Sequence, residues 1–399
     1  MAEPSPTDSD APLPVSGAWR PGDDPGNRRF ATVVDGRPYR LEGGGVLHHV
    51  EAAYETWGTL APDASNAVLV CHALTGDSHV AGRAGPGHPA PGWWEDLVGP
   101  GLGIDTERWF VVCVNVLGGC QGTTGPASID PATGRPYGSS FPVVTIRDMV
   151  RVQAMVADAL GIPRWHAVVG GSMGGMQALE WTIMHPDRVG SAVIIATSAA
   201  ASAQQIAWSM VGRRAIVLDA NFRGGDYYDR PPGEGPHEGL ALARQIAQIH
   251  YRSDVAFSER FGRVMLDRPK DNRFTLEQRF DVEGYLDYHG RKLVRRFDAN
   301  SYLRLNKAMD LHDVGRGRGG VAAALRRISC PCMVMSIDSD ILYPPHQQVE
   351  LCREMRAGGT RVGFYEIDSV DGHDGFLIES TQIAPILAAF LDGADDTLR

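Results

Sequence analysis

The sequence predicts an α/β fold in which a mostly parallel sheet carries helices on both faces and is interrupted by a helical insertion. Three observations support this prediction. Short apolar runs alternate with helical patterns through the first half of the chain, and this alternation is typical of parallel sheets. Strand-like runs then stop for a long stretch and resume near the C-terminus. A G-x-S-x-G sequence stands where one apolar run meets one helical pattern.

Five apolar runs, each bounded by glycine, proline or polar residues, predict buried strands. They cover residues 67–71, 109–116, 166–169, 192–196 and 333–337. Helical patterns at 146–160 and 173–185 lie between them. After residue 198 helical windows dominate, at 202–218, 238–250 and 299–311. We therefore expect a disordered tail at 1–25, a core at 26–197, a helical lid at 198–325 and the rest of the core at 326–399.

Composition limits the possible functions. A chain of 399 residues with 43% apolar and 22% charged residues fits one large core plus an insertion. The net charge of −10 argues against a general nucleic-acid binder. The N-terminus has no basic region or apolar core of a signal peptide, and the longest apolar stretch, 191–203, is too short to span a bilayer. Six scattered cysteines are typical of reduced thiols, so we expect a cytoplasmic enzyme.

Residues 170–174, Gly-Gly-Ser-Met-Gly, predict a catalytic serine. The motif follows the apolar run WHAVVG and precedes a helical pattern, which is the strand–turn–helix setting of a nucleophile elbow. Glycine on both sides of Ser172 removes bulk from a tight turn, and the helix N-terminus behind it directs amide groups at developing negative charge. The alternative is a glycine-rich turn that only packs helix against strand.

A serine nucleophile needs a base and an acid, which follow it in this order: serine, acid, histidine. Asp338 and Asp340 come directly after the run 333–337, and we prefer Asp340 because Pro344 ends its loop. His373 lies in a glycine-flanked loop near the C-terminus, before a helical pattern at 376–391, and fits the base. The backbone amides of Leu74 and Met173 would form the oxyanion hole.

Two other groups of residues are weaker candidates. Residues 315–320, GRGRGG, formally match a dinucleotide fingerprint but follow a helical, polar stretch rather than a strand. A flexible loop is the simpler interpretation, and a phosphate contact by Arg316 or Arg318 is the alternative. His72, His79 and His88 lack the spacing of metal ligands, so we predict no metal site. We interpret the side chain of His72 as one that holds the shape of its loop.

Six long motifs make the sequence similar to the homoserine O-acetyltransferase family, from about residue 44 to 391. They are HALTGDSHV at 72–80, the segment NVLGGCQG…IRDMV at 115–150, GGSMGGMQALEW at 170–181, NFRGGDYY at 221–228, DVGRGRGG at 313–320 and GHDGFLIE at 372–379. These motifs are much more specific than G-x-S-x-G alone. The stretch DRPPGEGPHEG at 229–239 departs from the family pattern, and we interpret it as loop variation.

The resemblance implies an α/β-hydrolase fold, acetyl-CoA as donor and L-homoserine as acceptor, in methionine biosynthesis. It implies a homodimer, no permanently bound cofactor, and roles for Ser172, Asp340 and His373 as the triad. Homoserine would be held by Arg244, Tyr251 and Asp374: Arg244 can fork onto its carboxylate and Asp374 can accept from its ammonium. The plainer interpretations are a surface arginine and a helix cap. Some family members use succinyl-CoA as donor or serine as acceptor, so the size of the acyl group stays open. Two other functions are alternatives: a hydrolase with the same triad, and a non-catalytic binding module.

Overall fold

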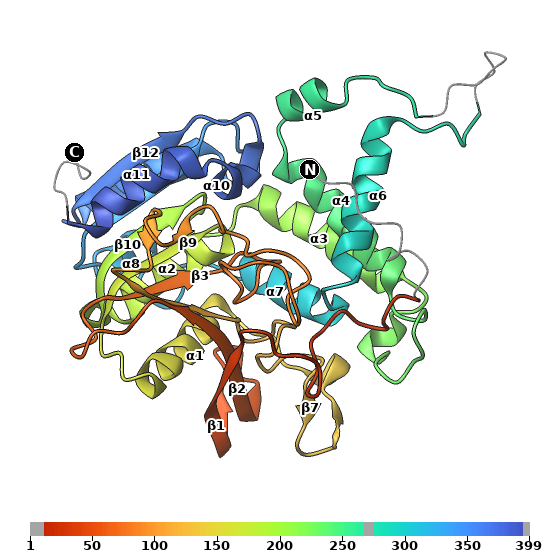
Figure 1. The fold of residues 1–399 in the computed structure, drawn as a ribbon, viewed down its shortest axis with the longest axis horizontal. Coiled ribbons are helices and arrows are strands. Elements are labelled where there is room, and N and C mark those ends of the chain that lie inside the picture. Colours follow the sequence, from red (N-terminus) through yellow and green to blue (C-terminus); the bar gives the residue numbers. More distant parts are fainter. Residues whose placement is uncertain (1–11, 267–274, 394–399) are drawn as a thin grey trace.

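The core of the protein is an eight-stranded sheet (Figure 1). The computed structural model describes residues 12–266 and 275–393. The first two strands in the sequence pair antiparallel, and the second of them also pairs antiparallel with its other neighbour in the sheet. The remaining pairs of this sheet are parallel. In spatial order the strands are β1 (Arg29–Arg40), β2 (Val46–Trp57), β6 (Phe110–Val114), β3 (Ala67–Cys71), β9 (Trp165–Gly171), β10 (Val189–Ile195), β11 (Cys332–Ile337) and β12 (Val362–Ile367).

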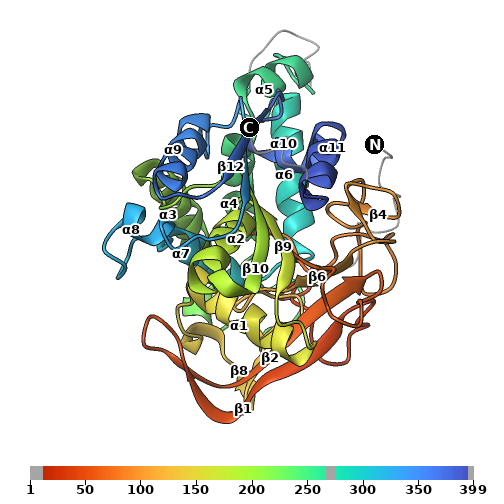
Figure 2. The ribbon, with the colours of Figure 1, turned by 90° about the vertical axis from the view of Figure 1, so that its left-hand side faces the viewer.

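Alternating side chains of the central strands feed two apolar cores, one on each face of the sheet. Leu69 packs on one side and Val68 and Val70 on the other, as the two-residue period of a strand requires. Figure 2 shows the sheet edge-on with helices on both sides. The first face is covered by α1 (Ile146–Ala159), α2 (Met173–Met184) and α9 (Pro345–Ala357), and the second by α11 (Ser380–Leu391). The predicted fold class is therefore confirmed.

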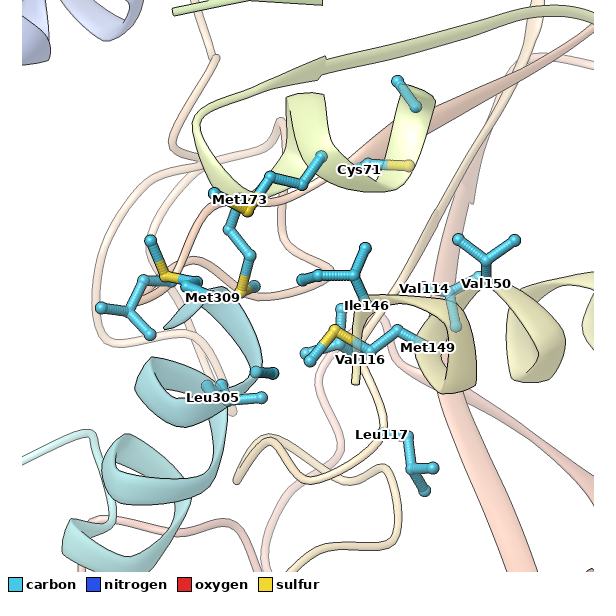
Figure 3. Packing of buried hydrophobic residues seen from close by; sticks show 14 of the residues in the cluster. Cys71, Val114, Val116, Leu117, Ile146, Met149, Val150, Met173, Leu305 and Met309 are labelled. Atoms are coloured by element: carbon cyan, nitrogen blue, oxygen red, sulfur yellow. The ribbon is translucent and has the colours of Figure 1, made fainter. Parts of the chain in front are cut away.

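Between β10 and β11 the chain forms helices rather than further strands of the sheet. They are α3 (Ala203–Leu218), α4 (His237–Tyr251), α5 (Asp254–Arg260), α6 (Asp281–Val294), α7 (Ala299–Asp310) and α8 (Val321–Leu325). Figure 3 shows Leu305 and Met309 of α7 meeting Met149 and Ile146 of α1 and Met173 of α2 in one apolar cluster. Because α7 shares the main core, this insertion is anchored to the sheet at one end.

Three regions differ from the sequence prediction. The antiparallel pair β1 and β2 was not predicted, because β1 has little of the buried pattern on which such predictions rest. Short strands also form outside the main sheet: β4 (Val98–Gly99), β5 (Ile104–Asp105), β7 (Ile129–Asp130) and β8 (Arg135–Pro136). The expected single helix at 376–391 is two, α10 (Gly375–Ile378) and α11, bent by 62° at Glu379. Glu379 has a non-helical backbone (ψ 45°), and its carboxylate accepts a hydrogen bond from Ser369 Oγ.

The tail predicted as disordered at 1–25 is wrong for residues 12–25, and residues 1–11 lie outside the described residues. Val15, Ser16 and Ala18 are buried. The Gly17 amide donates to the carbonyl of Phe297, and the Trp19 amide donates to the carbonyl of Cys120. The polar, proline-rich composition predicted disorder, but these few contacts with residues far along the chain fix the segment.

No single helix in the part of the chain that the structure describes has the length and apolar character to cross a membrane. The bent pair Gly372–Ile378 and Ser380–Leu391 meets the same test of length and composition only when both members are taken together.

Candidate active site

Ser172 stands in a strained turn between β9 and α2. Its φ is 57°, in the left-handed region that non-glycine residues rarely adopt, and its amide donates to the carbonyl of Ile195. The neighbouring glycines are required sterically: a Cβ on Gly170 would overlap the carbonyl of Gly174, and a Cβ on Gly174 would overlap the carbonyl of Cys71. The turn therefore lifts the Ser172 hydroxyl out of the strand and places it at the helix N-terminus.

The structure brings Ser172, His373 and Asp340 together from three separate elements. The Nε2 atom of His373 lies 2.9 Å from Ser172 Oγ, and its Nδ1 atom lies 2.7 Å from Asp340 Oδ2. A carboxylate only accepts, so Nδ1–H donates to Asp340 and Nε2 is left free to take the serine proton. Ser172 is 4% exposed and His373 3% exposed, so this chain of hydrogen bonds is closed to bulk water.

The two candidate acids are separated clearly. The second oxygen of Asp340 accepts from the amides of Leu342 and Tyr343, at 2.8 and 2.9 Å, which fixes the carboxylate toward His373. Asp338 is exposed and accepts from the Ser369 amide instead. The geometry therefore favours Asp340, the residue preferred from the sequence.

The loop after β3, here called the oxyanion loop, carries Leu74, whose amide is the predicted second donor of the oxyanion hole. Among the described residues, no acceptor takes the N–H of Leu74 or of Met173. The imidazole of His72 braces this loop, since Nδ1–H donates to the carbonyl of Ala73 and Nε2 accepts from the amide of Val116. Burial lowers the pKa of His72, which matches this neutral form. His72 thus holds the loop, as expected from the sequence.

Arg244 and Tyr251 lie on α4, and Asp374 lies beside His373. The guanidinium of Arg244 stands 5.5 Å from the centre of the Tyr251 ring and makes no ion pair within the described residues. Asp374 is paired with Arg252 at 3.4 Å, a residue that the sequence gave no reason to single out. Burial raises the pKa of Asp374, and Arg252 and Arg244 oppose that rise. A cationic and an acidic side chain therefore lie near His373, whose ring is 5.7 Å from that of Tyr251.

A small cavity of about 30 Å³ adjoins the oxyanion loop. Leu74 and Tyr251 line it together with Tyr302 and His250. His250 was not predicted from the sequence; its ring stacks on Trp208, and burial, with the nearby charges of His373 and Arg244, lowers its pKa to about 3. This histidine is therefore neutral at physiological pH, and the cavity, which Gln205, Asn306 and Asp310 also line, combines apolar and polar side chains.

On its other side the oxyanion loop borders a cleft of about 850 Å³, here called the basic cleft. Ala73, Thr75 and Gly76 of this loop line it, as does Leu377, which follows His373 by four residues. The guanidinium of Arg296 donates to the carbonyl of Thr75 at 2.7 Å, which sequence patterns did not indicate. The cleft is lined by the cations Arg20, Arg230, Arg244, Lys292, Arg295 and Arg296 and by the carboxylates Asp23, Asp24 and Asp77.

The arginines of the GRGRGG motif do not line this cleft. Arg318 donates to Glu180 at 2.7 Å, and Arg316 donates to Glu42 at 3.0 Å. Arg147 joins both carboxylates into one network, at 2.8 Å from Glu42 and 3.0 Å from Glu180. These arginines are neutralised by protein carboxylates, so the structure gives no support to a phosphate contact by Arg316 or Arg318.

Glu55, His79 and His88 form a buried cluster whose ligand atoms are close enough for a metal ion. Its hydrogen bonds favour an ion pair instead. Glu55 accepts from His79 Nδ1 at 2.9 Å, and although burial alone would lower the pKa of His79, Glu55 raises it. The rings of His79 and His88 stack at 3.8 Å, and His88 Nε2 accepts from the Asn27 amide. The Nε2 atom of His88 is thus occupied by an amide donor, and these hydrogen bonds and the stacked rings connect β2 with the loops that carry residues 27, 79 and 88.

The protein was also compared with known proteins. A family model for the α/β hydrolase fold matches residues 66–379. Homoserine O-acetyltransferase of Thermobifida fusca is 54% identical over 386 residues, which cover 96% of this chain and 99% of that protein. Homoserine O-acetyltransferase from Bacillus anthracis has a TM-score of 0.83 and 28% identity, covering 92% of this chain and 97% of that one. The structure of esterase E22 has a TM-score of 0.82 and 28% identity, and the match covers 91% of this chain and 99% of the esterase chain.

These similarities extend far beyond the serine motif. The match to the Thermobifida protein includes nearly the whole of both chains, and it confirms the resemblance seen in the six sequence motifs. The structural matches cover the sheet together with the helical insertion. The chain belongs to the homoserine O-acetyltransferase family of α/β hydrolases.

Proposed function

We propose that the protein moves an acetyl group from acetyl-CoA to the hydroxyl of L-homoserine, in methionine biosynthesis, through an acetyl-serine intermediate. The observation that carries this proposal is the triad with a cationic and an acidic side chain near it. Arg244 lies against the ring of Tyr251, and Asp374 follows His373 in the chain; these two side chains suit the carboxylate and ammonium of an amino acid. The chemistry uses only side chains and backbone amides, so it requires no bound cofactor.

In the first half-reaction the serine becomes acetylated. His373 Nε2 takes the proton of Ser172, and Oγ attacks the thioester carbonyl. The oxyanion is held by the amides of Leu74 and Met173, which have no other acceptor among the described residues. The C–S bond breaks, and His373, stabilised as imidazolium by Asp340, returns the proton to the departing thiolate.

In the second half-reaction homoserine replaces coenzyme A. Arg244 holds its carboxylate, Asp374 its ammonium, and Tyr251 packs against the arginine, so that the hydroxyl faces His373. His373 takes the hydroxyl proton, the oxygen attacks the acetyl carbonyl, and the ester bond to Ser172 breaks as the proton returns to Oγ. Serine, which is one methylene shorter, would place its hydroxyl short of the imidazole.

The cavity beside Leu74 favours a short acyl group. At about 30 Å³ it has room for a methyl group, and the described residues that line it include a carboxylate, Asp310, and a neutral histidine but no cation for a second carboxylate. Arg213 of α3 is paired with Asp310, a residue that lines the cavity, at 2.6 Å. We therefore propose acetyl rather than succinyl as the transferred group.

The alternative function is hydrolysis, favoured by the structural match to an esterase. Water at about 55 M competes with homoserine, and an oriented hydroxyl overcomes this excess because its effective molarity can reach roughly 10⁵ M. Thiol release from acetyl-CoA should stop after one turnover per site and become steady when L-homoserine is added, with L-serine serving poorly. Steady release that homoserine does not alter would establish a hydrolase.

The partners and compartment are also proposals. Exposed apolar side chains gather on α3 and α4, and we propose that this face joins two copies of the chain. They are Ile206, Met210, Val211, Val217, Leu218, Leu242 and Ile249. Leu218→Glu should convert the dimer into a monomer, as measured by sedimentation; an unchanged dimer would place the interface elsewhere.

The cysteines favour a cytoplasmic location. All six cysteines are free and buried, which suits the reducing cytoplasm, and cell fractionation would test that location.

A further inference from the structure

One wall of the basic cleft is made by two segments that lie outside the six sequence motifs. The first is residues 13–24, here called the N-terminal strap, and the second is the loop 229–239. They bind each other: the Gly233 amide donates to the carbonyl of Leu13, and His237 Nε2–H donates to the carbonyl of Pro14, both at 2.8 Å. The strap and the loop therefore form one continuous surface.

The strap is fixed against the C-terminal end of α6. Ser16 Oγ donates to Asp298 at 2.7 Å, and the Gly17 amide donates to the carbonyl of Phe297 at 3.2 Å. A Cβ on Gly17 would lie 2.6 Å from the amide nitrogen of Arg296, so only glycine allows this approach. Figure 1 shows the red strap passing close to the end of α6. The strap and the end of α6, which are far apart in the sequence, therefore line one cleft.

Four cations line this part of the cleft without a strong ion pair. Arg20, Lys292 and Arg295 have no carboxylate partner in the regions that the structure describes, and Arg230 has only exposed Asp229 at 3.5 Å. The carboxylates of the strap are used by its own backbone: Asp23 accepts from the amide of Arg20, and Asp24 from that of Gly26. Unpaired cations around one cleft, in a protein of net charge −10, favour a multiply charged anion.

We propose that the strap, the loop 229–239 and the end of α6 bind the pyrophosphate and nucleotide end of the acyl donor. This inference rests on the proposed function. Thr75 and Gly76, which follow Leu74 in the chain, and Leu377, four residues after His373, also line the cleft, so the thioester would lie toward these loops and the phosphates among the cations. Trp19 of the strap lines the same cleft and presents an aromatic face to the base. The volume of about 850 Å³ is suitable for a ligand of this size.

The test compares two donors that differ only beyond the thioester arm. Acetyl-CoA carries the phosphates, whereas S-acetyl-N-acetylcysteamine ends before them. Arg20→Glu and Arg295→Glu should each raise KM for acetyl-CoA about tenfold, since each replaces a charge-assisted contact with repulsion. KM for the short thioester should stay unchanged. Arg291→Glu is the matched control, because Arg291 is exposed on α6, four residues before Arg295, and does not line the cleft.

Three results would overturn the proposal. Equal changes in KM for both donors would mark Arg20 and Arg295 as structural, and no change for either donor would place the phosphates elsewhere. An equal effect of Arg291→Glu would indicate a general charge effect. These results are distinct from a failure of the proposed function, in which neither donor would acetylate the wild-type enzyme.

Discussion

Two groups of cationic side chains in this protein differ in their partners. In the first, Arg147 and Arg318 lie against Glu180, which is 1% exposed, and Arg316 pairs with Glu42. In the second, Arg20, Lys292, Arg295 and their neighbours line the basic cleft without such carboxylates. The first group contains a motif that resembles a phosphate site, and the second is scattered over the sequence. A cation is available to a ligand only where the protein has not already neutralised it.

The comparison predicts that removing Glu180 affects stability most. Glu180→Ala leaves Arg147 and Arg318 buried without their shared carboxylate, and loss of one partner of a buried pair costs about 3–5 kcal/mol. Chemical unfolding should show this loss, while KM for acetyl-CoA stays the same. Glu350→Ala, at an exposed pair with Arg353, is the control and should change little. A small loss of stability, or a raised KM, would break the distinction between the two groups.

Arg244 tests the second group at the acceptor. Arg244 makes no ion pair within the described chain. Arg244→Ala should lower kcat/KM for L-homoserine roughly 30- to 150-fold, which corresponds to about 2–3 kcal/mol of lost transition-state stabilisation. Acetylation of the enzyme involves no homoserine and should continue. Arg244→Lys keeps the charge without the fork and should recover part of the loss. Equal loss in both half-reactions would assign Arg244 to the first, structural group.

The smallest predicted effect concerns Glu42. Burial alone would raise its pKa, but hydrogen bonds from Thr145 and Arg316 and the charge of Arg147 lower it. A lowered pKa adds stability that is present above the unfolded value of about 4.3 and is lost as pH falls through the folded value. The free energy of unfolding of the wild type should exceed that of Glu42→Gln by about 1 kcal/mol at neutral pH, and this difference should vanish near pH 3. A difference that persists in acid would contradict this pairing.

The sequence contained enough to predict the central strands and the triad. Both depend on local patterns: an apolar run, a glycine turn at Ser172, and the order of serine, acid and histidine. The geometry then separated Asp340 from Asp338, because only Asp340 is turned toward His373 by the amides of residues 342 and 343.

What the sequence did not predict depends on contacts between distant residues. Arg252 meets Asp374, and Arg296 meets Thr75, across more than a hundred positions. The strap has the composition of a disordered tail, yet Ser16 and Gly17 bind residues 298 and 297. The GRGRGG motif suggested a possible phosphate contact that the structure does not support. Its arginines pair with Glu42 and Glu180, which no local sequence pattern reveals.

The central claim is that acetyl transfer passes through Ser172, and intact-mass analysis tests it most directly. Wild-type protein treated with acetyl-CoA should carry one acetyl group, which L-homoserine should remove with formation of O-acetylhomoserine. Ser172→Ala, a small change at the site, should remain folded and carry none. An acetyl group that persists on Ser172→Ala, or transfer to homoserine by that variant at the wild-type rate, would contradict the account.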